Sequence, residues 1–140
     1  MADAYSRWID KMTLPNFGAL NVLDVKLQLK VPDGSWFIVA KMDLDNDSSS
    51  WQTVDCRLRA GVDEDRNVVR LAPSGEKSVD MACLAFTVIH HFEGKRTQRV
   101  NEIFLGHMNP AQPSQIPHVS AGRAKITAIK VGSFVNEPSG

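Results

Sequence analysis

The sequence lacks the features that mark secreted, membrane-spanning or polyanion-binding proteins. Its two cysteines are too few for a disulfide framework, and its 16 basic residues cancel its 16 acidic ones. No apolar run approaches the roughly 18 residues needed to cross a bilayer, and residues 1–17 contain no apolar core of a signal peptide. We therefore expect no nucleic-acid partner, no membrane span, and a cytoplasmic protein or one released without a recognisable signal peptide.

Catalytic and metal-binding motifs are also missing. The segment beginning at Asp43 resembles the start of a calcium loop, but Ser48 and Val54 stand where that loop needs glycine and glutamate. His90 and His91 are adjacent on a predicted strand, so they project to opposite faces and cannot chelate one ion together. We expect no cofactor and no metal, and we favour a protein that is not an enzyme.

The two cysteines do not suggest a nucleophile. Cys83 lies seven residues before His90, on the opposite face of the alternation, which argues against a catalytic pair. Cys56 and Cys83 both lie within apolar strand patterns. Buried free thiols and an inter-strand disulfide are both compatible with these positions.

Alternating hydrophobicity is what the sequence does contain. It is clearest in three segments, 21–31, 35–44 and 52–60, where the alternate side chains are apolar from Leu23, Trp36 and Val54 onward. A period of two is typical of half-buried antiparallel strands. Between the last two segments, aspartate, asparagine and serine residues favour a turn because their side chains bond the local backbone.

Further strands are predicted at 68–71, 81–92, 98–105 and 123–135, separated by turn-forming residues. Residues 61–67 read as a charged loop, and residues 106–122 as a long loop with three prolines. Seven or eight short strands with this spacing predict an all-β fold, an antiparallel β-sandwich or barrel.

The N-terminal segment is predicted to differ from the rest. Four apolar residues have the i, i+3, i+4, i+7 spacing of a short amphipathic helix: Tyr5, Trp8, Ile9 and Met12. Such a short helix must dock on something, either the protein's own core or a neighbouring subunit as an arm. We therefore divide the chain into a helical arm (1–18), a sandwich domain (19–135) and a frayed tail (136–140).

Three phrases of the sequence, GSWFIVAKMDLDNDSSSWQTVDCRL, CLAFTVIHHF and AKITAIKVGSF, resemble a group of small actinobacterial and phage-associated β-proteins. These proteins are similar in layout to the jelly-roll domains of the complement-component and tumour-necrosis-factor class. The resemblance implies a jelly roll that is often trimeric and that binds rather than catalyses. Such relatives often carry a second cysteine on the strand that reads 100–105 here; this chain has none there, which argues against the family's disulfide from Cys56.

We therefore expect a non-enzymatic β-sandwich that self-associates, with a trimer favoured, and that binds a protein, small-molecule or glycan ligand through its loops. One alternative is an enzyme or carrier with a small-molecule cavity near Cys83, His90 or His91. Another is a structural component of a phage-like particle. Five polar or aromatic residues of the predicted turns and loops are the candidate binding residues: Asp45, Asp47, Trp51, His107 and His118.

Overall fold

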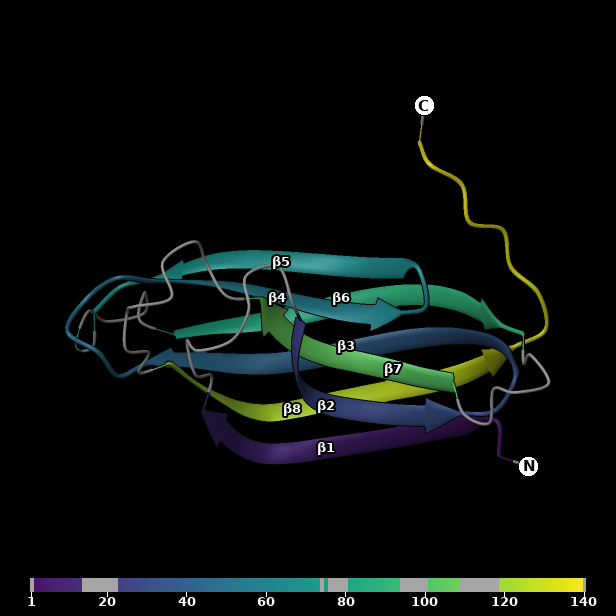
Figure 1. Ribbon diagram of the computed structural model, residues 1–140, viewed down its shortest axis with the longest axis horizontal. Helices are drawn as coiled ribbons and strands as arrows, with labels where there is room; N and C mark the ends of the chain where they lie inside the picture. The colour runs from purple at the N-terminus through teal and green to yellow at the C-terminus, as the bar shows by residue number, and fades with distance from the viewer. Residues whose placement is uncertain are drawn as a thin grey trace.

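The computed structural model describes residues 2–13, 23–73, 75, 81–93, 101–108 and 119–139 (Figure 1). Over these residues it contains eight strands: β1 (Ala4–Thr13), β2 (Leu23–Val31), β3 (Gly34–Asn46), β4 (Gln52–Ala60), β5 (Asp63–Leu71), β6 (Met81–Phe92), β7 (Asn101–Met108) and β8 (Val119–Val131). The predicted all-β class is confirmed.

The strands form two four-stranded antiparallel sheets that pack face to face as a β-sandwich. Sheet A has the order β1-β8-β3-β6, and sheet B has the order β2-β7-β4-β5. The strands run along the length of the molecule, and both chain termini lie at the same end of it (Figure 1). Among the described residues, no helix is long and apolar enough to cross a bilayer.

The predicted alternation of β2, β3 and β4 is confirmed, because one face of each strand is buried between the sheets. Trp36, at the start of β3, is 0% exposed, and its Nε1–H donates a hydrogen bond to the carbonyl of Pro32 at 3.0 Å. A buried indole needs such a partner for its N–H. Residues of both sheets form one core around it, including Leu29, Ile38, Met42, Leu44, Val54, Cys56, Leu58, Phe86, Ile103, Leu105 and Ile126.

The predicted N-terminal helix is wrong, because the same residues form the edge strand β1 paired with β8. Tyr5 and Ile9 are also two strand periods apart, so both can face the core from a strand. The Tyr5 ring packs edge-on against Trp36, with centroids 5.6 Å apart. Trp8 falls on the other face and is 65% exposed. Met12 also lies in β1, opposite Ala121.

The predicted charged loop at 61–67 is largely strand, since β5 begins at Asp63 after a short turn. Gly61 has a φ of +60°, and a Cβ there would collide with the imidazole of His90. Glycine is therefore required both by the backbone conformation and by the close approach of His90. The hairpin closes the edge of the sandwich, because Asp63 Oδ2 lies 2.6 Å from Nδ1 of His90 on β6.

A buried amide fixes the opposite end of the sandwich. Asn46 is 0% exposed, and its Nδ2 donates to the carbonyls of Ser50 and Ala72 at 2.9 and 2.8 Å. Its Oδ1 accepts from the backbone N–H and the hydroxyl of Ser48 at 3.0 and 2.7 Å. One side chain thus joins the β3–β4 turn to the residue that follows β5.

The last strand, β8, begins four residues earlier than predicted and ends at Val131. Residues 132–139 have no regular structure (Figure 1), and Asn136 lines a groove together with Phe37 and Ile89 of sheet A. Most of the predicted long loop, residues 109–118, lies outside the described residues.

Candidate functional site

The outer face of sheet A carries the candidate site. Cross-strand pairing arranges its outward side chains in rows that cross all four strands. The apolar row consists of Ala4, Ile129, Phe37 and Ile89. The next row along the strands, the hydroxyl row, consists of Ser6, Thr127, Val39 and Thr87. Phe37 and Ile129 are 37% and 44% exposed, so this sheet face presents large apolar side chains to solvent.

The third row, which we call the cationic row, combines one aromatic ring with two ammonium groups. It consists of Trp8, Lys125, Lys41 and Ala85. Lys41 and Lys125 are directly opposite each other on β3 and β8, and both are exposed. Within the described residues, neither lysine is in an ion pair. The pairing register thus places two positive charges side by side on the central strands of sheet A, although the net charge of the chain is zero.

A β-bulge brings a third cation next to this row. Between two successive paired positions, β3 has one residue whereas β8 has two, Arg123 and Ala124. Arg123 has a φ of +49°, the left-handed region that L-residues other than asparagine and aspartate seldom occupy. Its side chain is 77% exposed, and its Nε donates to Asp43 Oδ2 at 2.8 Å. Bulges of this kind re-aim a side chain and are frequent beside functional sites.

Two shallow grooves adjoin the bulge. The first has a volume of about 300 Å³ and is lined by Trp8, Ile9, Asp10, Lys41, Arg123, Ala124 and Lys125. Three of these residues are cations and one is a carboxylate. The second has a volume of about 270 Å³ and includes Asp10, Asp43, Asp45, Asp47 and Arg123 in its lining. Among the described residues, no group of three or more potential metal ligands is placed to hold an ion.

Asp43 links the bulge to an exposed thiol on β6. Sγ of Cys83 donates to Asp43 Oδ1 at 2.7 Å, while the other carboxylate oxygen binds Arg123. The hydrogen bond to Asp43, and the negative charge of that carboxylate, raise the pKa of the Cys83 thiol. A raised pKa disfavours the thiolate that a nucleophilic cysteine needs. The hydrogen bond between Cys83 and Asp43 therefore favours a structural role for Cys83 over nucleophilic catalysis.

The predicted binding residues do not form one site. Trp51 is 50% exposed and lies under the guanidinium of Arg70, 4.7 Å from the ring centroid. Asp45 and Asp47 line the second groove, and Trp51 is not among the described residues that line it. His107 belongs to β7 rather than to a loop, and it is only 3% exposed, with Nδ1 3.9 Å from Asp24 Oδ2. His118 lies outside the described residues.

The remaining histidines and cysteines are dispersed. His90 is bound to Asp63, and Nδ1 of His91 lies 2.8 Å from the hydroxyl of Ser35. Cys83 and His90 are near opposite ends of β6, which places them about 23 Å apart at the rise of a strand. Both cysteines are free. Burial raises the pKa of the Cys56 thiol to about 12, so that cysteine is a core residue rather than a reactive one.

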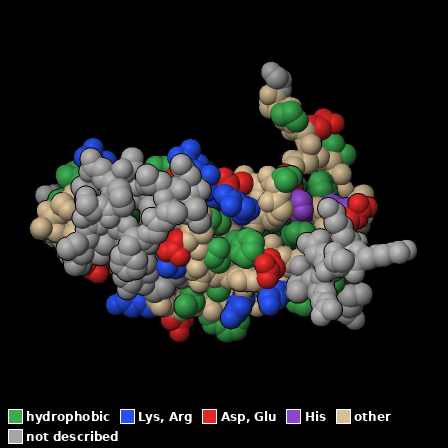
Figure 2. Space-filling model, in the orientation of Figure 1, with side chains coloured by type: hydrophobic (Ala, Val, Ile, Leu, Met, Phe, Trp, Pro, Cys, Tyr) green, Lys and Arg blue, Asp and Glu red, His purple; other side chains and the backbone are tan. Residues whose placement is uncertain are grey.

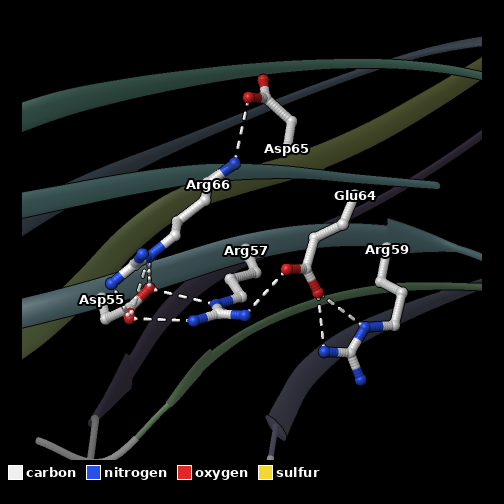
Figure 3. A network of polar contacts seen from close by, with 6 residues as sticks. All are labelled: Asp55, Arg57, Arg59, Glu64, Asp65 and Arg66. Atoms are coloured by element: carbon white, nitrogen blue, oxygen red, sulfur yellow. Dashed lines mark hydrogen bonds and ion pairs between the residues drawn. The ribbon is translucent and has the colours of Figure 1, made fainter. Parts of the chain in front are cut away.

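The outer face of sheet B has a different character, a lattice of ion pairs between β4 and β5 (Figure 3). The Asp55 carboxylate contacts Arg57 and Arg66 at 3.2 and 2.9 Å, and Glu64 contacts Arg57 and Arg59 at 2.8 and 2.6 Å. Burial by itself would raise the pKa of Asp55, but the hydrogen bonds and positive charges of Arg57 and Arg66 outweigh it and lower that pKa. All three arginines of this lattice are therefore in ion pairs with its two carboxylates.

Basic and acidic residues are equally numerous in the chain, at 16 each. On the face shown in Figure 2, basic and acidic side chains are interspersed with small groups of hydrophobic ones. The lysines of the cationic row differ from the arginines of sheet B in having no ion pair with a described residue. Sequence reasoning missed Lys41, Arg123 and Lys125, because their proximity depends on which strands pair. The available signal was the outward position of each lysine in an alternating strand.

The comparisons with known proteins add a distant fold likeness. No protein-family model matches the chain, and no curated protein matches it. A solved structure of black queen cell virus is similar to it with a TM-score of 0.39 and 8% identity, over 98% of this chain and 78% of that chain. At that distance, function has to be inferred from the chain's own residues.

Proposed function

We propose that the sandwich is a jelly roll. In a jelly roll, two Greek keys wrap eight strands so that the first strand pairs with the last and the pairing nests inward. The pairs β1–β8 and β3–β6 in sheet A, and β2–β7 and β4–β5 in sheet B, support this topology. Inter-strand NOEs from Phe37 to both Ile129 and Ile89 test the central part of the arrangement.

We further infer that the protein is a non-enzymatic assembly module that self-associates through the outer face of sheet A. The observation that supports this most directly is the apolar row, which crosses all four strands of a solvent-facing sheet. The row on its other side, with Ser35, His91 and Val131, and the hydroxyl row also contain no lysine, arginine, aspartate or glutamate. A charge-depleted centre with aromatic and aliphatic side chains is typical of protein interfaces.

The size of this region suits a second copy of the chain. Three rows occupy about 20 Å of strand length, and four strands about 19 Å of width, so the region covers about 400 Å². Two copies packed on it would bury roughly 800 Å², which is below the range of about 1,200–2,000 Å² for stable specific interfaces and within that of weak, transient ones. We therefore expect weak and reversible association. Face-to-face packing would give pairs, whereas the trimer implied by the family resemblance would require this face to meet a different surface of its neighbour.

Light scattering over a wide range of protein concentration tests the proposal. We expect the wild-type mass to rise with concentration and the Phe37→Lys variant to remain monomeric. Val68→Lys is the matched control, because Val68 is 51% exposed on the other sheet. A wild-type protein that is monomeric throughout, or an equal loss of association in both variants, contradicts the proposal. A mass of many copies would instead favour a structural component of a phage-like particle.

A further inference from the structure

The cationic row is an unfavourable arrangement for the folded chain alone. Like charges directly opposite each other on neighbouring strands destabilise a sheet, and Lys41 and Lys125 occupy such a pair in its two central strands. Arg123, which lines the same groove, is held there by a bulge in a strained backbone conformation. Local features that oppose stability are expected at functional positions.

A bound anion would reverse the sign of this interaction. The groove of about 300 Å³ is lined by both lysines and Arg123, and among the described residues Asp10 is the one carboxylate in its lining. Arg123 uses Nε to contact Asp43, and a guanidinium has four further N–H donors for a second partner. Phosphate oxygens suit this combination of two ammonium groups and one guanidinium.

The same groove contains a flat aromatic surface. Trp8 is 65% exposed and lies directly opposite Lys125, on the side away from Lys41. An exposed indole beside cations can stack on a nucleobase while the cations contact the attached phosphates. Trp36, by contrast, is fully buried, and Trp51 is covered on one side by Arg70.

We propose that this groove binds a nucleotide, with the base stacked on Trp8 and the phosphates contacting Lys41, Lys125 and Arg123. The balanced net charge predicts no extended nucleic-acid footprint, and a site of one nucleotide does not need one. The inference does not rest on self-association, because the apolar row and the cationic row share no residue.

Isothermal titration with ATP at low salt tests the proposal, with tripolyphosphate and adenosine as half-ligands. We expect ATP to bind more tightly than tripolyphosphate by about 5- to 150-fold, the range that stacking on one aromatic side chain supplies. Adenosine should bind weakest. Quenching of Trp8 fluorescence should accompany ATP binding and be absent in Trp8→Ala. Equal affinity for ATP and tripolyphosphate would overturn the base-stacking assignment.

Two double variants with the same change in net charge distinguish binding at this groove from a general electrostatic attraction of ATP to the protein. Lys41→Gln/Lys125→Gln should lower ATP affinity at least about tenfold, while Lys30→Gln/Lys130→Gln, with the same change in net charge elsewhere, should retain most of it. Trp8→Ala should lower affinity for ATP but not for tripolyphosphate. Equal losses in both double variants would overturn the proposal.

Two further arms address stability and source. The Lys41→Gln/Lys125→Gln variant should unfold at a higher temperature than wild type, because the repulsion between the two lysines is gone. A loss of ATP binding in this variant then cannot be attributed to unfolding. The ATP titration is repeated with Phe37→Lys, the variant that we expect to remain monomeric. Unchanged ATP affinity in this variant would show that nucleotide binding does not depend on self-association. An oligothymidylate that binds more weakly than ATP assigns the site to free nucleotides, and one that binds more tightly assigns it to nucleotides within a single strand.

Discussion

The carboxylate of Asp65 on β5 accepts a hydrogen bond from the backbone N–H of Thr87 on β6, with 2.8 Å between nitrogen and Oδ2. Each strand is the edge of its own sheet, so this bond joins the sheets where neither ladder continues. Asn67 makes the complementary contact, because its Nδ2 donates a hydrogen bond to the carbonyl of Ala85 at 2.7 Å. Side chains of β5 thus occupy edge groups of β6 that would otherwise be open to another chain.

Removing this contact should weaken the closure of the sandwich. We expect Asp65→Ala to lower the free energy of unfolding by about 1 kcal/mol, the typical net value of one hydrogen bond. Asp65→Asn retains an acceptor oxygen and should lose less. Urea unfolding gives the free energies, and amide hydrogen exchange at Thr87 should accelerate in the alanine variant. Unchanged exchange at Thr87 would contradict a closing role for Asp65.

The buried amide of Asn46 should matter more than any surface residue of its turn. Asn46→Ala would leave the carbonyl of Ala72 and the N–H of Ser48 without their partner in a buried setting, and we expect a loss of about 3 kcal/mol. The neighbouring Asp47 is exposed, so Asp47→Ala should change stability by less than about 0.5 kcal/mol. Similar urea midpoints for the two variants would show that Asn46 does not anchor this end.

The strands that the sequence predicted best are those with one buried and one wet face. In β3, Trp36 and Ile38 face the core while Phe37 faces outward, so the alternation is visible without a partner strand. In β5, the alternate residues Asp65 and Asn67 are polar because they bind the edge of β6 rather than the core. A strand whose two sides are both polar has no hydrophobic period, and it reads as a loop.

The same reasoning explains the errors at the N-terminus and at the site. The spacing of Tyr5 and Ile9 fits a helix and a strand equally, and the choice was made by pairing with β8, more than a hundred residues away in sequence. The outward position of Lys41 was predictable from alternation. The register between β3 and β8 places Lys41 opposite Lys125 and creates the bulge at Arg123. Hydrophobic periodicity within one strand does not reveal the register between strands that are distant in sequence.

Acid should remove the contribution of Asp55 to stability. The pKa of Asp55 is lowered in the folded protein, so its contribution is present above the ordinary aspartate value of 3.8 and is lost as pH falls through the folded-state pKa. The difference in unfolding free energy between wild type and Asp55→Asn should therefore shrink below that pH. Urea titrations across the acidic range measure it. In an Arg57→Gln background the difference should depend less on pH; an unaltered dependence would mean that Arg57 is not a cause.

The two cysteines should differ in their reactivity toward iodoacetamide. Cys83 is exposed and should be alkylated in the native protein, slowly because the hydrogen bond to Asp43 raises its pKa. Asp43→Asn should accelerate the reaction at a fixed, mildly alkaline pH. Cys56, buried and with a pKa raised to about 12, should react only after unfolding. Mass spectrometry should find one label on the native wild type and none on Cys83→Ser; a second native label would contradict the burial of Cys56.

The backbone strain at Arg123 can be separated from the work of its side chain. Arg123→Ala removes the exposed ion pair with Asp43, worth up to about 1 kcal/mol, but keeps a Cβ in the left-handed conformation. Arg123→Gly removes both the ion pair and the steric cost. Because the left-handed region costs a residue with a Cβ about 1–2 kcal/mol, Arg123→Gly should be more stable than Arg123→Ala by about that amount in urea unfolding. If the two variants unfold alike, the bulge is not strained. If Arg123→Gly is the more stable variant and both variants bind ATP more weakly than wild type, the backbone is strained at the residue whose guanidinium contacts the nucleotide.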